Sequence, residues 1–491
     1  MKQMVYVWLL LLLGTSCNPI EDLNSNPNSV SETHPQYLLT NIQWQAFQVE
    51  GVAPLLATRM LVQTDGEDVN QYYAWNRGGF GEYSRLRDVQ KMLEEAERLD
   101  LPAYQALGKF FRAYYFYNLT LRFGNLPYTE ALQGEEQAIY APRYDTQKEV
   151  FKGILSELKE ADALLEAEET PIAGDIVFGG SALQWRKIVN AFRLKILLTL
   201  SHKTADADLN VVEAFAEVFQ NKPLPASNED NGQLVFMDVS GARYTEFNSS
   251  GYGSARYMDS TFVRRLQDRR DPRLFAYATQ TRRGKEQGLA IDDFSAYEGG
   301  NPIAPYNDVN VKASEGKVSR VHDRYTKDPV NEPHQFLSYS EVQLILAEAA
   351  VRGWIAADAE TFYREGVKAS FSFYAAHVSD LAHLYGEAEA EAYLAQPLVG
   401  LSQATDELAK IERIQMQKYL RSFLQGGWTM YYENLRTNVP AFATLAGSPR
   451  PFRWMYPTGE YQNNANHVAA ALKSQFGSDD DDIHQKTWWL N

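Results

Sequence analysis

The stretch AYQALGKFFRAYYFYNLTLRFG, residues 103–124, decides the fold class of this chain. It is apolar on most sides, contains no proline and ends at Gly124, a residue type that commonly terminates a helix. The preceding stretch, residues 85–99, carries apolar residues at helical spacing and charges on the opposite face. Leu101-Pro102 separates the two stretches. The sequence therefore predicts two antiparallel helices joined by a short connection, with the rings of 110–117 in the core.

The same pattern recurs twice along the chain. Residues 146–165 pair with 181–200, and residues 338–353 pair with 359–374. In the last pair, small residues such as Gly366 would let the two helices approach closely. Repeated helical pairs of roughly 35–55 residues are typical of tetratricopeptide-type architectures. We therefore predict a mostly α fold of tetratricopeptide-like helical hairpins.

The stretch from about 203 to 335 differs in composition and in its apolar pattern. Gly, Pro, Asn and Asp cluster there and helical periodicity weakens, which indicates a loop-rich insertion with a few short strands. QLVFMDV, residues 233–239, is the best strand candidate. The alternating charges of 264–273 favour a salt-bridged helix end over a phosphate site. The tail from 440 is loop-rich, and its four aspartates at 479–482 lack the spacing of a calcium loop, so we expect a solvated segment.

Composition excludes several classes of function. Of the 491 residues, 47 are Lys or Arg and 63 are Asp or Glu, and a net charge of −16 argues against a nucleic-acid binder. One cysteine excludes an internal disulfide, a zinc site of several thiolates and a Cys-x-x-Cys pair. The nucleotide, zincin and serine-hydrolase motifs are missing from the sequence. We predict no catalytic residue, no metal ligand and no cofactor.

The N-terminal sequence MKQMVYVWLLLLLGTSC, residues 1–17, has the layout of a secretory signal peptide. Its apolar run is far too short to span a bilayer, and small residues precede Cys17. A bacterial lipoprotein carries its acylated cysteine at this position, and several acyl chains give stable anchoring. We expect a signal peptide at 1–16, lipidation of Cys17, a polar tether over 17–34 and a single domain over 35–491. The alternative is a general signal peptide with an incidental cysteine.

Several segments, in order along the chain, form a recognisable set. They are the lipoprotein signal with DLNSNPNSV (22–30), GKFFRAYYFYNLTLRFGNLPYTEAL (108–132), MDSTFVRRLQDRRDPRLFAY (258–277), SYSEVQLILAEAAVRGW (338–354), IERIQMQKYLRSFLQGGWTMYYENLRTNVPAF (411–442) and PFRWMYPTGEYQNNANHVAAAL (451–472). Together they resemble the SusD/RagB family of nutrient-binding outer-membrane lipoproteins, in its divergent SusD-like branch. The chain departs from the family's usual Trp-x-x-x-Arg-Arg-type run at GGWTMYYENLRT, where only Arg436 remains, and we interpret that element as structural.

The resemblance implies a function as well as a fold. Such proteins have four tetratricopeptide-like hairpins that support a loop-rich ligand-binding half. They lie on the outer membrane, facing the cell exterior, over a TonB-dependent transporter of the SusC-like type. They bind an oligosaccharide, or a peptide in some members, and deliver it to the transporter without catalysis.

Candidate ligand residues combine flat rings with polar edges, as sugar recognition requires. The loop 64–83 has this composition and matches the region of the family's ligand loops. The alternative for each ring is packing against the helical core. The predicted ligand-binding residues are Tyr72, Tyr73, Trp75, Asn76 and Arg77, followed by Tyr244, Tyr252 and Tyr297.

Two other functions remain open at this point. A secreted glycan-active hydrolase would need two carboxylates across a cleft, which sequence cannot place. A helical-repeat scaffold without a small ligand would need only the hairpins.

Overall fold

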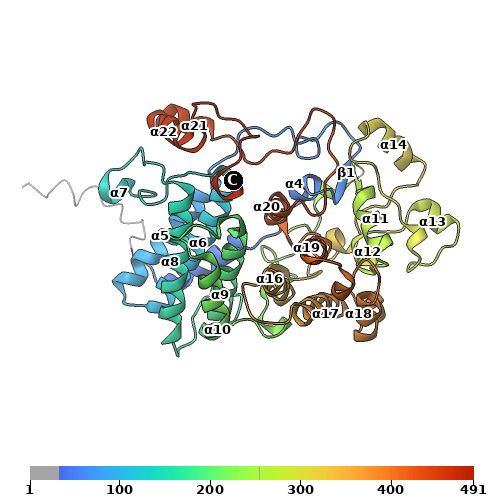
Figure 1. Cartoon of the computed structure of the whole chain (residues 1–491), viewed down its shortest axis with the longest axis horizontal. Helices are drawn as coiled ribbons and strands as arrows, with labels where there is room; N and C mark the ends of the chain where they lie inside the picture. Colours follow the sequence, from blue (N-terminus) through green and yellow to red (C-terminus); the bar gives the residue numbers. More distant parts are fainter. Residues whose placement is uncertain (1–31, 254) are drawn as a thin grey trace, which may run out of the picture.

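The computed structural model describes residues 32–253 and 255–491 (Figure 1). The predicted signal peptide, Cys17 and nearly all of the tether lie outside these residues. Among the described residues, no helix combines the length and the apolar character needed to cross a membrane.

The predicted N-terminal helical pairs are confirmed. Pro102 occupies the first turn of α6, and Gly124, with φ 87°, ends it. Thr146 begins α8 with a capping box to Glu149. The helices pack in sequence, α5 on α6, α6 on α8 and α8 on α9, on the left of Figure 1. The helices of this half are α3 (Pro35–Ala46), α5 (Gly81–Arg98), α6 (Pro102–Phe123), α7 (Gly134–Gln137), α8 (Gln147–Glu166), α9 (Ala182–Thr199) and α10 (Val211–Asn221). The short helix α4 (Val52–Ala57) lies instead beside β1 and α20.

The third predicted pair is also confirmed, as α16 and α17. A Cβ at Gly366 would lie 2.9 Å from Leu344 Cγ and 3.1 Å from the Ser340 carbonyl oxygen, so glycine is needed for the close approach of the two helices. α19 and α20 lie beside α16 in the centre of Figure 1. The helices of this half are α16 (Tyr339–Val351), α17 (Ala359–His377), α18 (Glu387–Leu394), α19 (Glu407–Leu420) and α20 (Gly427–Thr437).

The stretch 203–335 contributes strands to two small antiparallel sheets and holds several short helices, most of them on the right of Figure 1. In the first sheet Leu61 faces Met258, and in the second Gly232 faces Leu337. The strands are β1 (Leu61–Gln63), β2 (Gly232–Leu234), β3 (Arg256–Met258) and β4 (His334–Leu337). The helices after β3 are α11 (Ser260–Asp268), α12 (Arg273–Tyr277), α13 (Arg282–Glu286), α14 (Tyr306–Ser314) and α15 (Arg324–Lys327).

Two sequence predictions need correction. The predicted strand 233–239 ends at Leu234: Phe236 is still buried, but Val235, Met237 and Val239 are exposed and a turn begins there. The tail from 440 is more ordered than expected, since it contains α21 (Thr458–Asn463) and α22 (Ala465–Phe476) and fully buries Trp489.

The charged run 264–273 is salt-bridged, as predicted. Arg264 lies 3.8 Å from Asp268 in an exposed pair, whereas the Asp271–Arg273 pair, at 2.6 Å, is completely buried. Tyr393 and Gln417 complete the hydrogen bonding of that buried pair. These partners on other helices make Asp271 and Arg273, but not the exposed start of the run, part of the packed interior.

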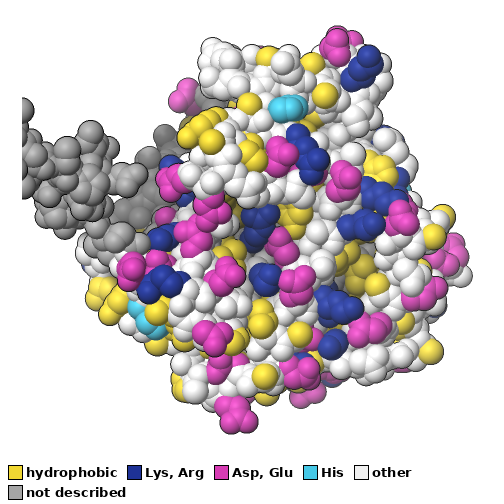
Figure 2. Space-filling model, turned by 90° about the vertical axis from the view of Figure 1, so that its left-hand side faces the viewer, with side chains coloured by type: hydrophobic (Ala, Val, Ile, Leu, Met, Phe, Trp, Pro, Cys, Tyr) yellow, Lys and Arg dark blue, Asp and Glu magenta, His cyan; other side chains and the backbone are white. Residues whose placement is uncertain are grey.

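The core is rich in aromatic rings. Phe110, Phe111, Tyr115, Phe116 and Tyr117 are buried, as predicted for the segment 110–117. Burial of each such ring stabilises the fold by about 1.5–3 kcal/mol. The other ring of the segment, Tyr114, is half-buried. On the face shown in Figure 2, acidic and basic side chains are interspersed rather than segregated.

A buried ion cluster joins α16, α19 and α20. The Glu348 carboxylate accepts hydrogen bonds from both Nη atoms of Arg436, at 2.7 and 2.8 Å. It also lies 3.2 Å from Lys418 and 2.8 Å from Arg352. Arg436 of the GGWTMYYENLRT element is therefore a structural residue.

Candidate functional site

The loop before α5 carries five of the predicted ligand residues, and a tight turn sets its shape. The Asp68 carboxylate accepts hydrogen bonds from the backbone N–H groups of Asn70 and Gln71, at 2.8 and 3.2 Å. The N–H groups of Tyr72 and Ala74 then donate to the carbonyls of Asp68 and Val69. Tyr72 and Tyr73 still belong to the turn, Tyr73 with a left-handed φ of 56°, and 72–76 form an irregular run without strand geometry.

Side chains along this run alternate between the interior and the surface. Tyr73 and Trp75 are buried, at 3% and 5% exposure, whereas Ala74 and Asn76 are exposed and Tyr72 is half-buried. The loop therefore presents Tyr72 and Asn76 outward and is held by the rings between them.

The two buried rings are anchors of the loop. Tyr73 donates its hydroxyl to the Ala57 carbonyl at 2.8 Å, and burial raises its pKa to about 12. Trp75 stacks on Trp454 with a centroid distance of 4.7 Å and donates its indole N–H to the Arg453 carbonyl. Both rings therefore pack in the core, which was the alternative to ligand binding at these positions.

Arg77 ties the loop to the C-terminal tail. Its guanidinium donates to the Tyr456 carbonyl at 2.7 Å and lies 3.2 Å from the Asp481 carboxylate. Asp481 also binds Arg453 at 2.6 Å and the Tyr461 hydroxyl at 2.6 Å. The expectation of a solvated 479–482 segment is therefore wrong for Asp481, because these donors hold its carboxylate inside the protein.

A hollow lies where this loop meets the tail. It encloses about 790 Å³ of empty space, the open region at its mouth included. The exposed His484 and Asp482 stand among the residues that line it. Sequence reasoning did not choose the tail residues, because nothing in their local pattern shows that they meet the loop. The lining consists of Tyr72, Tyr73, Ala74, Trp75, Asn76, Gly447, Ser448, Pro449, Met455, Asp481, Asp482, Ile483 and His484.

The second group of predicted residues is placed elsewhere. Tyr244, Tyr252 and Tyr297 are buried, at 1%, 7% and 2% exposure, and none of them lines this hollow. Tyr244 packs edge-on against Phe236, and the Tyr297 hydroxyl donates to the Ile291 carbonyl at 2.6 Å. The structure thus brings the loop 72–76 together with the tail and keeps these three tyrosines apart from that site.

The hollow offers contacts for binding rather than a reactive constellation. An aromatic ring, an amide, an imidazole and a carboxylate can accept and donate hydrogen bonds to a polar ligand and cover its apolar face. In the part of the chain that the structure describes, no group of three or more His, Cys, Asp or Glu side chains is arranged to hold a metal ion.

Fold and site together define a helical-hairpin protein with a binding hollow framed by loops. The family model for SusD-like proteins, described as "Starch-binding associating with outer membrane", matches residues 27–457. The chain therefore belongs to the SusD-like family of outer-membrane nutrient-binding proteins, whose members bind their ligands without catalysis. The resemblance found in the sequence is confirmed.

Solved structures agree with this assignment. A SusD homologue from Bacteroides fragilis is 50% identical, with a TM-score of 0.90, covering 94% of this chain and 100% of that chain. A candidate outer-membrane nutrient-binding protein from Bacteroides vulgatus is 49% identical, with a TM-score of 0.91 and the same coverage. A further B. fragilis SusD homologue is 32% identical, with a TM-score of 0.87, again covering 94% and 100%. No match was found among curated proteins.

Proposed function

We propose that this protein is a lipid-anchored receptor on the outside of the outer membrane. It captures an oligosaccharide, or alternatively a peptide, and delivers it to a TonB-dependent transporter of the SusC-like type. Family membership supports the receptor role, and the position of Cys17 supports the anchor. The observation that carries the proposal is the hollow in which the predicted loop 72–76 meets the tail residues 481–484.

The chemistry of the hollow fits a neutral polar ligand. The ring of Tyr72 can cover the C–H face of a sugar, while Asn76 and His484 offer hydrogen bonds to hydroxyl groups at its rim. A peptide would use the same groups through its backbone amides. Family description favours the oligosaccharide, since it names starch binding.

Binding of a glycan and peptide panel to the purified protein tests the proposal. Tyr72→Ala should weaken the best ligand by about tenfold or more, because stacking against the ring would be lost. Tyr140→Ala is the matched control, since Tyr140 is 80% exposed and lies outside the hollow. Unchanged affinity in Tyr72→Ala, or an equal loss of affinity in Tyr140→Ala, would show that the ligand does not bind in the hollow.

A further inference from the structure

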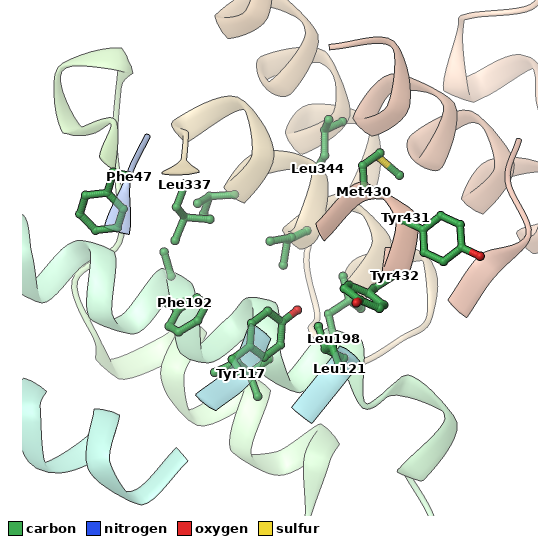
Figure 3. Packing of buried hydrophobic residues seen from close by; sticks show 14 of the residues in the cluster. Phe47, Tyr117, Leu121, Phe192, Leu198, Leu337, Leu344, Met430, Tyr431 and Tyr432 are labelled. Carbon is green, nitrogen blue, oxygen red and sulfur yellow. The ribbon is translucent and has the colours of Figure 1, made fainter. Parts of the chain in front are cut away.

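A second cavity lies in the seam between α6 and α9 on one side and α16, α19 and α20 on the other. It encloses about 980 Å³ of empty space, its open mouth included, and shares no lining residue with the hollow at 72–76. Tyr117 and Phe192 line it from one side, and Leu337 and Met430 from the other; Figure 3 shows these residues across the seam. Tyr114 and Phe336 add half-buried rings to its wall.

Most charged groups in the cavity wall are already paired. Lys195 lies 2.8 Å from Glu341, and Arg421 lies 3.6 Å from the same carboxylate. Lys418 lies 2.8 Å from Glu433. Each of these three cations is therefore held by a wall carboxylate at 3.6 Å or less.

A buried histidine in the same wall adds no charge to the cavity at neutral pH. His334 makes a 2.8 Å hydrogen bond with the Phe47 carbonyl, and burial lowers its pKa to about 4. At neutral pH its ring is therefore uncharged.

Glu50 is the exception among the wall carboxylates. Within the described ranges, no Lys, Arg or His nitrogen lies within 4.0 Å of it, and the nearby Arg122 is bound to Glu82 at 2.7 Å. Oε2 of Glu50 accepts the backbone N–H of Trp428 at 2.6 Å, while Oε1 receives no hydrogen bond from the described residues. A Cβ at Gly427, which has φ 48°, would overlap the Glu50 carboxylate, so glycine leaves room for this group.

Glu50 is both accessible and enclosed. Its side chain is exposed by surface area because it projects into the open cavity. Enclosure by the cavity wall raises the pKa of Glu50 above its ordinary value. Burial, and then the Glu50 carboxylate, also raise the pKa of the Tyr114 hydroxyl, and both residues line the cavity.

We infer that this cavity binds a small organic ammonium compound with an aromatic or aliphatic group, using Glu50 as counter-ion and the rings of Tyr114 and Phe336 as apolar wall. Among the described residues no cation lies within 4.0 Å of the Glu50 carboxylate, and an ammonium group in the cavity would supply that partner. The rings can hold the apolar portion and add cation–π attraction. This site goes beyond the proposed nutrient role and does not depend on it.

Calorimetric titration of the purified protein tests the inference, with phenethylamine as probe and 2-phenylethanol as its neutral counterpart. We expect saturable binding of the amine that is at least about tenfold tighter than binding of the alcohol. Glu50→Gln should remove that preference, since its amide oxygen can still accept the Trp428 N–H but carries no charge. Glu412→Gln makes the same chemical change on an exposed position of α19 and should behave as wild type.

A second variant tests the cavity independently, in case Glu50→Gln does not fold. Thr429→Phe fills part of the cavity from a half-buried wall position and should weaken binding of the amine. Absence of amine binding, equal affinity for amine and alcohol, or an unchanged preference in Glu50→Gln would each overturn the inference. Glycan or peptide binding at the hollow would be unaffected by any of these results, so the two proposals can fail separately.

Discussion

Trp75 has the sequence context of a ligand-binding residue but packs in the hydrophobic core. Its composition and neighbours predict a ligand platform, yet its ring stacks on Trp454 and meets Trp428 and Tyr431 edge-on, at centroid distances of 5.6 and 5.3 Å. With 5% of its surface exposed, most of the ring is used by these contacts. The outward neighbours Tyr72 and Asn76 are the better positioned of the predicted ligand residues.

Substitution of Trp75 should therefore be a stability mutation. Trp75→Ala should lower the free energy of unfolding by about 3–5 kcal/mol, because it empties a packed aromatic cluster. Asn76→Ala, at the next and exposed position, should change it little. Denaturant unfolding followed by tryptophan fluorescence or circular dichroism measures both, and equal stability of the two variants would contradict the anchor role.

At the scale of elements, the Glu348 cluster connects three helices that are distant in sequence. Burial alone would raise the carboxylate pKa, but Arg436 and then Lys418 outweigh it, so the pKa of Glu348 is well below its ordinary value. By the same balance the pKa of Glu433 is lowered to about 2. Both groups therefore stabilise the fold at neutral pH as carboxylates.

Glu348→Gln should destabilise the protein by about 3–5 kcal/mol at pH 7, because it leaves buried cations without their partner. A folded pKa below the unfolded value of about 4.3 means that the carboxylate's contribution is present above that pH and is lost as pH falls through the folded pKa. The difference between wild type and variant should accordingly narrow below about pH 4. Urea unfolding at a series of pH values measures this.

An exposed pair provides the comparison for that measurement. Arg282 and Glu286 lie 3.7 Å apart with most of both side chains in solvent. Glu286→Gln should leave the unfolding free energy nearly unchanged, since exposed ion pairs contribute little. A pH-independent difference between wild type and Glu348→Gln would show that the carboxylate charge is not what stabilises the three-helix junction.

At the scale of the whole molecule, membrane attachment should depend on one atom, the thiol of Cys17. Cys17→Ser should abolish incorporation of labelled palmitate and release the protein from the outer-membrane fraction, because the chain has no second cysteine to acylate. Fractionation of cells with immunoblotting measures the distribution. Retention of the variant in the membrane at the wild-type level would contradict lipid anchoring as the means of attachment.

The helices and their pairing could be predicted from the sequence because their signals are local. Periodic apolar residues, Pro102 at a helix start and Gly124 at a helix end act within a few residues of where they stand. The prediction of a strand over 233–239 was wrong in its length, because a strand extends only as far as neighbouring segments cover its apolar side chains, and Met237 is 58% exposed.

The sequence by itself determined the helical-hairpin scaffold, the family and the loop 72–76 as a candidate binding segment. Only the tertiary structure decided which side chains of that loop face outward, that Asp481 anchors it, and that Glu50 lines the seam cavity with no cationic partner among the residues that the structure describes. These facts depend on contacts across hundreds of residues, such as the pairing of Arg77 with Asp481. The local apolar periodicity of a sequence does not identify such partners. Burial and ion pairing depend on the distant segments that the fold places next to each residue.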